Sequence, residues 1–169
     1  MHGFARTIQR AEPLEDPLGR YVEMIVAASA QMTDLLASLS LLARIEGARY
    51  EPVLSKTDTR ELASAAALQL EGVRVEGEGE SVETDAEGVS HALAAFALCA
   101  QRHGPVPTVT LRVQGRDVVV TPVTDAAAPV IVGDDLKDLG AAIAMRAVRA
   151  LGGDVQLADG ELRVTVQTA

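Results

Sequence analysis

The sequence predicts an α+β fold, in which a helical hairpin precedes an α/β sandwich whose helices cover one face of a mixed sheet. A heptad repeat in the first third of the chain is typical of one long helix. After it, short runs of alternating apolar and polar residues come in pairs, and helical stretches separate the pairs. We therefore expect a helical part at residues 1–52, a linker at 48–57, and the sandwich at 58–169.

The helical part is built around one long helix, expected at residues 18–47. A short helix at 3–11 and a connector at 12–19, which contains two prolines, come before it. Two interleaved apolar rows recur every seven residues and form a heptad seam: Ile25, Met32 and Leu39, and Tyr21, Ala28, Leu35 and Leu42. The segment 3–11 is too short to cover this seam, so we expect a second copy of the chain to cover it. The alternative is a helix that lies on the core of its own domain.

The sandwich elements follow from capping residues and from alternation. Three helices each open at an aspartate that can cap the first turn: 58–70 with the capping box Asp58/Glu61, 86–103 after Asp85, and one from Asp134 or Asp135 to about Leu151. The predicted strands are, in chain order, 73–77, 81–84, 108–113, 117–123, 154–158 and 161–167. Asp159-Gly160 joins the last two strands as a tight hairpin. The stretch 126–129 is expected to be a loop.

Composition and charge exclude several classes of function. The net charge of −9 argues against nucleic acid and against an anionic membrane surface as partners. One cysteine excludes a disulfide framework and a zinc site of several cysteines. The N-terminus does not resemble a signal peptide, and no apolar run is long enough to span a bilayer. We expect a soluble cytoplasmic protein with a core of aliphatic residues, because aromatic residues make up only 2% of the chain.

Two stretches of the sequence resemble one protein family. They are LLARIEGARYEP at residues 41–52 and AIAMRAVRALGGDVQLADGELRVTV at 142–166. Together with the order of elements, they are similar to the end of the dimerisation hairpin and the close of the ATP-binding domain in sensor histidine kinases. The resemblance covers nearly the whole chain. It implies a helical hairpin for dimerisation and phosphotransfer at 1–52, followed by a sandwich of the histidine-kinase ATPase type.

The phosphoacceptor of that family is a histidine near the start of its first helix. The stretch HGFARTIQ at residues 2–9 looks like a later part of that helix, so the acceptor is expected upstream of Gly3. His2 stands in another register and lacks the acidic residue and proline that follow the family's histidine. We do not expect His2 to be phosphorylated.

The family's magnesium-binding asparagines have no counterpart in this chain. When Asp85 and residues 102–104 are aligned with the family pattern, the two asparagine positions fall on Ala95 and Cys99. Neither side chain offers the oxygen ligand that Mg²⁺ requires. Cys99 is interpreted as a small buried apolar residue, with no convincing base or cation nearby. His91 and His103 lie twelve residues apart, which is not a ligand spacing, so no metal site is expected.

The glycine-rich boxes around the nucleotide are also altered. Asp125 would be the aspartate that contacts adenine, although a surface aspartate is the alternative. Alanine and proline replace the glycines that follow it, at residues 127 and 129. The second box keeps Gly140, but it has Asp138 where the family has glycine, which places a carboxylate beside the phosphate path. Only seven residues separate Val130 from Asp138, so the lid over the phosphates is absent.

These features favour a degenerate histidine-kinase-like signalling protein. We expect no catalytic residue, no metal, and neither ATP nor Mg²⁺ as a cofactor, with Cys99, Asp125 and Gly140 as a vestigial nucleotide pocket. A homodimer through the helix at 18–47 is expected, with a response-regulator receiver domain or a partner kinase as a further partner. The alternatives are a histidine phosphotransferase with its acceptor upstream of this chain, an active kinase, and a structural domain with a likeness of fold only.

Overall fold

The computed structural model describes residues 18–47, 49–68 and 70–167. The expected short helix at 3–11 and His2 lie outside the described residues. The chain divides into two compact units, Met1–Ser40 and Leu41–Ala169, which are considered separately. Among the helices of the described ranges, none combines the length and the apolar character that crossing a bilayer needs.

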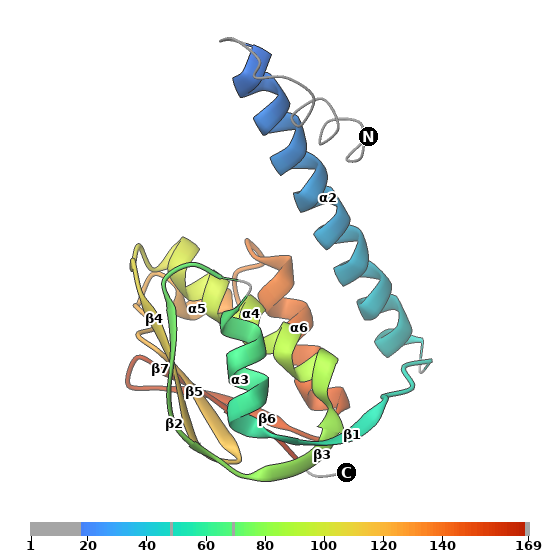
Figure 1. Cartoon of the computed structure of the whole chain (residues 1–169), viewed down its shortest axis with the longest axis vertical. Coiled ribbons are helices and arrows are strands. Elements are labelled where there is room, and N and C mark those ends of the chain that lie inside the picture. The colour runs from blue at the N-terminus through green and yellow to red at the C-terminus, as the bar shows by residue number, and fades with distance from the viewer. Residues whose placement is uncertain (1–17, 48, 69, 168–169) are drawn as a thin grey trace. The chain divides into compact units, whose positions relative to one another are not determined.

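The long helix of the sequence analysis is confirmed as α2, which runs over Leu18–Glu46 (Figure 1). It ends where the amide of Gly47 donates to the carbonyl of Ala43 at 3.0 Å. Within the described seam, the side chains of Tyr21, Ile25, Met32 and Leu39 are exposed in the single chain. Helices in proteins are stabilised mainly by the packing of an apolar face, so an exposed apolar row of this kind is a candidate contact surface.

The second unit is the predicted sandwich. Its elements are β1 (Leu54–Asp58), α3 (Thr59–Ala67), β2 (Val73–Gly79), β3 (Ser81–Asp85), α4 (Ala86–His103), β4 (Val109–Gly115), β5 (Asp117–Thr121), α5 (Ala128–Ile131), α6 (Leu139–Ala150), β6 (Asp154–Ala158) and β7 (Glu161–Thr165). Five strands form one sheet in the order β2-β4-β5-β7-β6. The β2–β4 pair is parallel and the other pairs are antiparallel, which confirms a mixed sheet.

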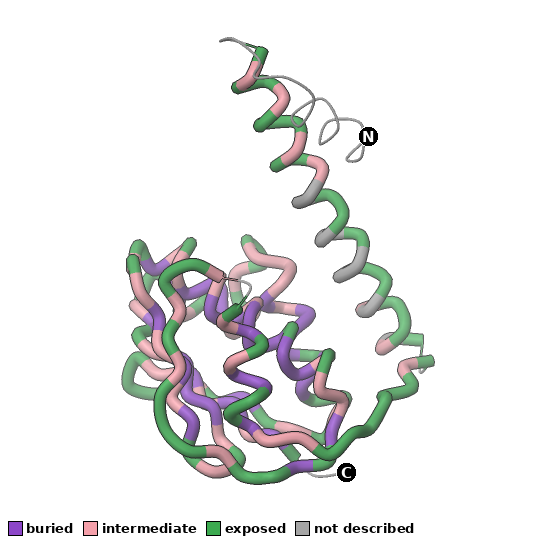
Figure 2. Tube along the Cα trace, viewed as in Figure 1, coloured by how far each residue is buried: buried purple, intermediate pink, exposed green. Residues whose placement is uncertain are grey.

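Helices α3, α4 and α6 cover one face of this sheet, as predicted (Figure 1). The core lies between the two layers, where buried positions of the helices face buried positions of the strands (Figure 2). Phe96 on α4 is the largest side chain in it, and aliphatic residues and alanines make up the rest of the core cluster apart from Cys99 and Met145. The predicted aliphatic core is therefore confirmed.

The closing hairpin agrees closely with its prediction. Strands β6 and β7 are antiparallel, and Ala158 pairs with Glu161 across the turn. Asp159 and Gly160 have φ values of 53° and 74°. Positive φ at both central residues is the turn that matches the right-handed twist of a hairpin, and it favours Asp-Gly.

The expected linker contains a strand that the sequence analysis did not predict. Strand β1 pairs antiparallel with β3 in a separate two-stranded sheet, from Leu54 with Asp85 to Asp58 with Ser81. The stretch LSKTD shows no alternation between apolar and polar residues, and none of its five residues is buried. Backbone pairing alone makes it a strand, so hydrophobic periodicity gave no signal for it.

Three boundaries were predicted wrongly. The expected loop at 126–129 contains the start of the short helix α5, and α3 ends at Ala67 rather than Leu70. Helix α6 is capped by Asp138, and neither Asp134 nor Asp135 caps it. The amide of Asp135 donates to the carbonyl of Pro129 at 2.8 Å, so this aspartate belongs to the turn that closes α5.

Candidate functional site

The candidate site lies on α4, the helix of the sandwich with the largest number of buried residues. Asp85 caps its first turn by accepting a hydrogen bond from the amide of Gly88 at 2.9 Å. Arg102 and His103 lie in the last turn, where positive charge complements the helix dipole. Small residues such as Ala92 dominate the rest of the helix, which allows close packing against its neighbours α3 and α6.

The first turn of α6 lies against the outer side of α4. The Asp138 carboxylate caps α6 by accepting a hydrogen bond from the amide of Ala141 at 3.0 Å. A Cβ atom added to Gly140 would lie 3.9 Å from the Cβ of Ala95 and 3.1 Å from an oxygen of Asp138. The structure thus brings together the residues at the expected asparagine positions of α4 and at the expected second glycine box.

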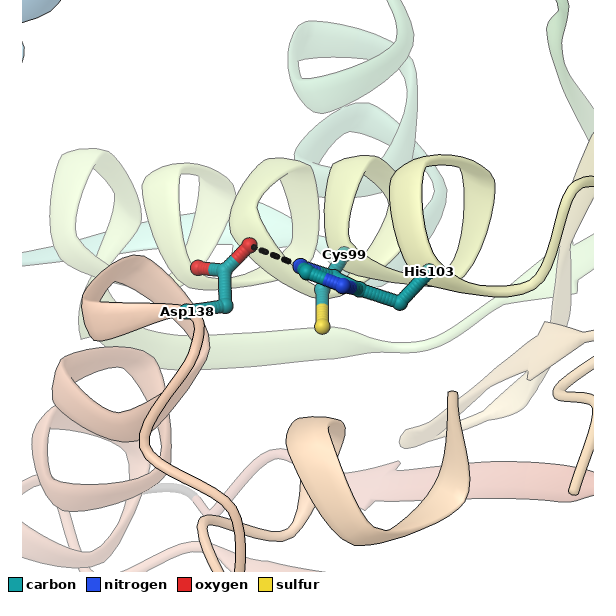
Figure 3. Close-up of side chains that lie close together, drawn as sticks. All are labelled: Cys99, His103 and Asp138. Atoms are coloured by element: carbon teal, nitrogen blue, oxygen red, sulfur yellow. Dashed lines mark ion pairs between the residues drawn. The ribbon is translucent and has the colours of Figure 1, made fainter. Parts of the chain in front are cut away.

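Three side chains of different chemistry meet at this junction. The Nε2 atom of His103 lies 3.4 Å from Oδ2 of Asp138. The Cys99 sulfur, one nitrogen of His103 and one oxygen of Asp138 all lie within 4.8 Å of one another. Figure 3 shows Cys99 and His103 projecting from α4 toward the start of α6, with the Asp138 carboxylate facing the imidazole. We call these three residues the Cys-His-Asp cluster.

The environment of Cys99 keeps its thiol protonated. Burial and then the negative charge of Asp138 raise the pKa of Cys99 to about 12, although the positive charge of Arg102 opposes both effects. A thiol with so high a pKa is a weak nucleophile, because the thiolate is the reactive form. The expectation that Cys99 is buried is confirmed.

The expectation that no base stands near Cys99 is wrong. His103 follows it by four residues on the same helix, so the two side chains share one face. This spacing is visible in the sequence, whereas the expectation of no metal site rested on the distance of His103 from His91, which is exposed. Asp138 was named only as an unfavourable neighbour of phosphate. The prediction that the chain holds no metal stays a prediction, and the cluster gives a reason to test it.

Asp125, the expected adenine contact, lies in a different environment from the Cys-His-Asp cluster. Asp125 is an exposed residue in the turn before α5 and is not one of the clustered residues. Ala127, which replaces a box glycine, is fully buried, and Ile131 of α5 is fully buried as well. Helix α5 packs against α4. Core side chains therefore occupy the region that follows Asp125.

A small cavity of about 10 Å³ lies elsewhere in the sandwich. Its lining includes Val89 near the start of α4 and Val148 near the end of α6. This volume suffices for about one water molecule, whereas ligand pockets measure about 300–1,000 Å³. The cavity shares no residue with the Cys-His-Asp cluster.

No protein-family model and no curated protein match the sequence. Solved structures do match the fold. The histidine kinase AdeS of Acinetobacter baumannii matches with a TM-score of 0.64 and 15% identity, over 99% of this chain and 93% of that one. The chain has the fold of sensor histidine kinases. The cytoplasmic segment of the histidine kinase QseC matches with a TM-score of 0.51 and 14% identity, over 85% of this chain and 95% of that one.

A third solved structure that matches this fold is that of a larger protein. Full-length ShkA, in a complex with AMPPNP, matches with a TM-score of 0.64 and 20% identity. The match covers 99% of this chain but 43% of ShkA, so the chain spans less than half of that protein. At these identities, the likeness establishes the α+β architecture, and the chemistry of the site must be argued from its own residues.

Proposed function

We propose that this protein is a histidine-kinase-like regulator of a two-component system that acts by binding other proteins and does not use ATP. The observation that carries this proposal is the chemistry of the face formed by α4 and the start of α6. Ala95 and Cys99 stand where the resemblance places the magnesium ligands, and the Asp138 carboxylate lies against Cys99 and His103. Under this proposal, Cys99, Asp125 and Gly140 are remnants of a nucleotide pocket.

Mg²⁺ and phosphates would meet unfavourable groups on this face. Mg²⁺ takes oxygen ligands in octahedral geometry, and Ala95 and Cys99 offer a methyl group and a protonated thiol. The Asp138 side chain is only 12% exposed, so its negative charge is poorly screened and would repel a triphosphate. Fully buried Ala127 and Ile131 also support the absence of an adenine pocket beside α5.

The helix α2 supports a binding role through a second copy of the chain. Met32 is 61% exposed and Leu39 is 42% exposed in the single chain, and both lie on the heptad seam. Burial of such side chains contributes about 1.5–3 kcal/mol each. We expect a homodimer through this helix, in the cytoplasm, with a receiver domain or a partner kinase docking on it and with no role for membrane or nucleic acid.

A calorimetric titration of the full chain with ATP and Mg²⁺ tests the proposal. We expect no heat of binding at millimolar nucleotide. A titration of the Asp138→Asn variant serves as the matched comparison, since asparagine also caps a helix but carries no charge. Micromolar, Mg²⁺-dependent binding by the unaltered chain would overturn the proposal and favour an active kinase.

A histidine phosphotransferase is the second candidate function. The altered nucleotide face and the long helix favour it, because phosphotransfer between receiver domains needs the helices and does not need ATP. Its acceptor histidine would lie upstream of the residues in this chain. Incubation of a chain extended at its N-terminus with a phosphorylated receiver domain tests it: transfer of the phosphoryl group to a histidine would establish this function, and no transfer would exclude it.

A further inference from the structure

We propose that Cys99, His103 and Asp138 bind a divalent transition-metal ion, with Zn²⁺ as the best fit, at the junction of α4 and α6. This inference goes beyond the proposed function and does not depend on it. It rests on the only group of three or more His, Cys, Asp or Glu side chains within the described residues whose ligand atoms lie close enough together to share an ion.

The spacing of the ligand atoms is close to that of a metal site. A tetrahedral zinc ion with bonds of 2.0–2.3 Å holds its ligand atoms about 3.4–3.6 Å apart. The His103–Asp138 separation of 3.4 Å already meets this value. The remaining separations are at most 4.8 Å. Changes of side-chain rotamer that shorten them by up to about 1.3 Å would complete the geometry.

The chemical types of the three ligands determine which metal ion fits the site. A thiolate, an imidazole and a carboxylate form a mixed sulfur, nitrogen and oxygen set, which suits Zn²⁺ and related ions rather than Mg²⁺ or Ca²⁺. When the ion binds, the Cys99 sulfur exchanges its proton for the metal. The thiolate and the Asp138 carboxylate then carry two negative charges, which balance the charge of the ion. A neutral site is the form that a half-buried location tolerates best.

The surrounding structure orients the Asp138 carboxylate and leaves a route for the ion. Oδ1 of Asp138 is held by the amide of Ala141, so Oδ2 is the oxygen that faces the cluster. Such an outer hydrogen bond orients a metal-binding carboxylate. The side chains of His103 and Asp138 are 26% and 12% exposed, whereas Cys99 is fully buried. The ion would therefore enter from the His103 side, and a fourth position would remain for water or another ligand.

A bound ion would join the end of α4 to the start of α6. A ligand that binds only the folded state stabilises it by an amount that grows with the ligand concentration. Without an ion, the imidazole of His103 contacts the carboxylate of Asp138 directly, with Nε2 lying 3.4 Å from Oδ2. The two cases differ in one respect that can be measured, namely whether the sulfur of Cys99 is bonded to a metal.

A titration of the full, reduced chain with Co²⁺ and then Zn²⁺ decides whether the cluster binds a metal ion. Thiolate-bound Co²⁺ absorbs in the near ultraviolet by charge transfer from sulfur, and Zn²⁺ should displace it. We expect one ion per chain, this absorption band, and a melting temperature that rises with added Zn²⁺. Cys99→Ala should abolish the band, since alanine fits the alanine-rich helix, and Asp138→Asn should weaken binding more than about tenfold while keeping the helix cap.

The exposed His91 on the same helix provides the control, because His91→Ala removes a histidine outside the cluster. This variant should bind Co²⁺ like the unaltered chain. The proposal would be overturned if Co²⁺ produced no sulfur band, or if His91→Ala weakened binding as much as Asp138→Asn does. In either case, the cluster would be a contact between side chains of two packed helices and not a metal site.

Discussion

The hydroxyl of Tyr50 donates a hydrogen bond to Oδ2 of Asp85 at 2.9 Å. The same carboxylate accepts a bond from the amide of Val53 at 3.3 Å and caps α4 through the amide of Gly88. The Arg44 guanidinium lies over the Tyr50 ring, 5.6 Å from its centre. One aspartate therefore links the segment that follows α2 to the first turn of the helix that carries the Cys-His-Asp cluster.

Removal of the Tyr50 hydroxyl should destabilise the sandwich. In Tyr50→Phe, the ring stays while Asp85 loses one of its donors, so we expect the free energy of unfolding to fall by about 1 kcal/mol. Urea denaturation measures this change. Tyr21→Phe is the matched control, since Tyr21 is exposed in the single chain and the variant keeps its ring on the α2 seam, so stability should change by less than about 0.5 kcal/mol. Equal effects of the two variants would contradict the role assigned to the bond.

Tyr50 should ionise only at unusually high pH. Burial and then the hydrogen bond to Asp85 raise the pKa of Tyr50 from 10.0 to about 12. Because the folded-state pKa lies above the unfolded value, the neutral hydroxyl stabilises the fold in full below pH 10 and loses this effect as the pH rises toward 12. The chain has two tyrosines and no tryptophan, so the Tyr21→Phe variant reports Tyr50 alone by tyrosinate absorbance. A midpoint near pH 10 in this variant would refute the prediction.

The buried hydroxyl of Thr59 should stabilise the fold at the junction of α3 and the sheets. It accepts a bond from the amide of Glu80 at 3.0 Å and donates to the carbonyl of Gly115 at 2.5 Å. Thr59→Val leaves both groups without this partner, so we expect a loss of about 1–3 kcal/mol in the free energy of unfolding. Thr59→Ser keeps the hydroxyl and should retain most of the stability. If Thr59→Val and Thr59→Ser unfolded at the same temperature, the two hydrogen bonds would make no measurable contribution to stability.

A charge on the α2 seam should dissociate the dimer. In Leu39→Glu, a charged group would enter the expected interface between two copies, where burial of an unpaired charge is costly. We expect light scattering to give a dimer mass for the unaltered chain and a monomer mass for this variant. Leu68→Glu, at a position that is 88% exposed on the sandwich, should remain dimeric. A monomer for the unaltered chain at high micromolar concentration would disprove dimerisation through α2.

Much of the fold was predictable because its signals are local. The capping box of Asp58 with Glu61 and the cap at Asp85 were both predicted and are both present. The start of α6 was predicted wrongly, although Asp138 has the same capping chemistry as Asp134 and Asp135. Three aspartates within five residues can each cap a helix, and the contact of Asp135 with the turn after α5 decides between them.

By itself, the sequence determined the elements whose residues lie next to one another in the chain: the long α2, the capped start of α4 and the Asp-Gly turn of the closing hairpin. Helix capping, periodicity and turn chemistry act over a few residues, so they can be read directly. Only the tertiary structure decided that β1 pairs with β3, because that strand is specified by a distant backbone. It also decided the Cys-His-Asp cluster, since β4, β5 and α5 separate His103 from Asp138 in the chain. Packing of α6 on α4 brings these two residues together, and no local pattern encodes that contact.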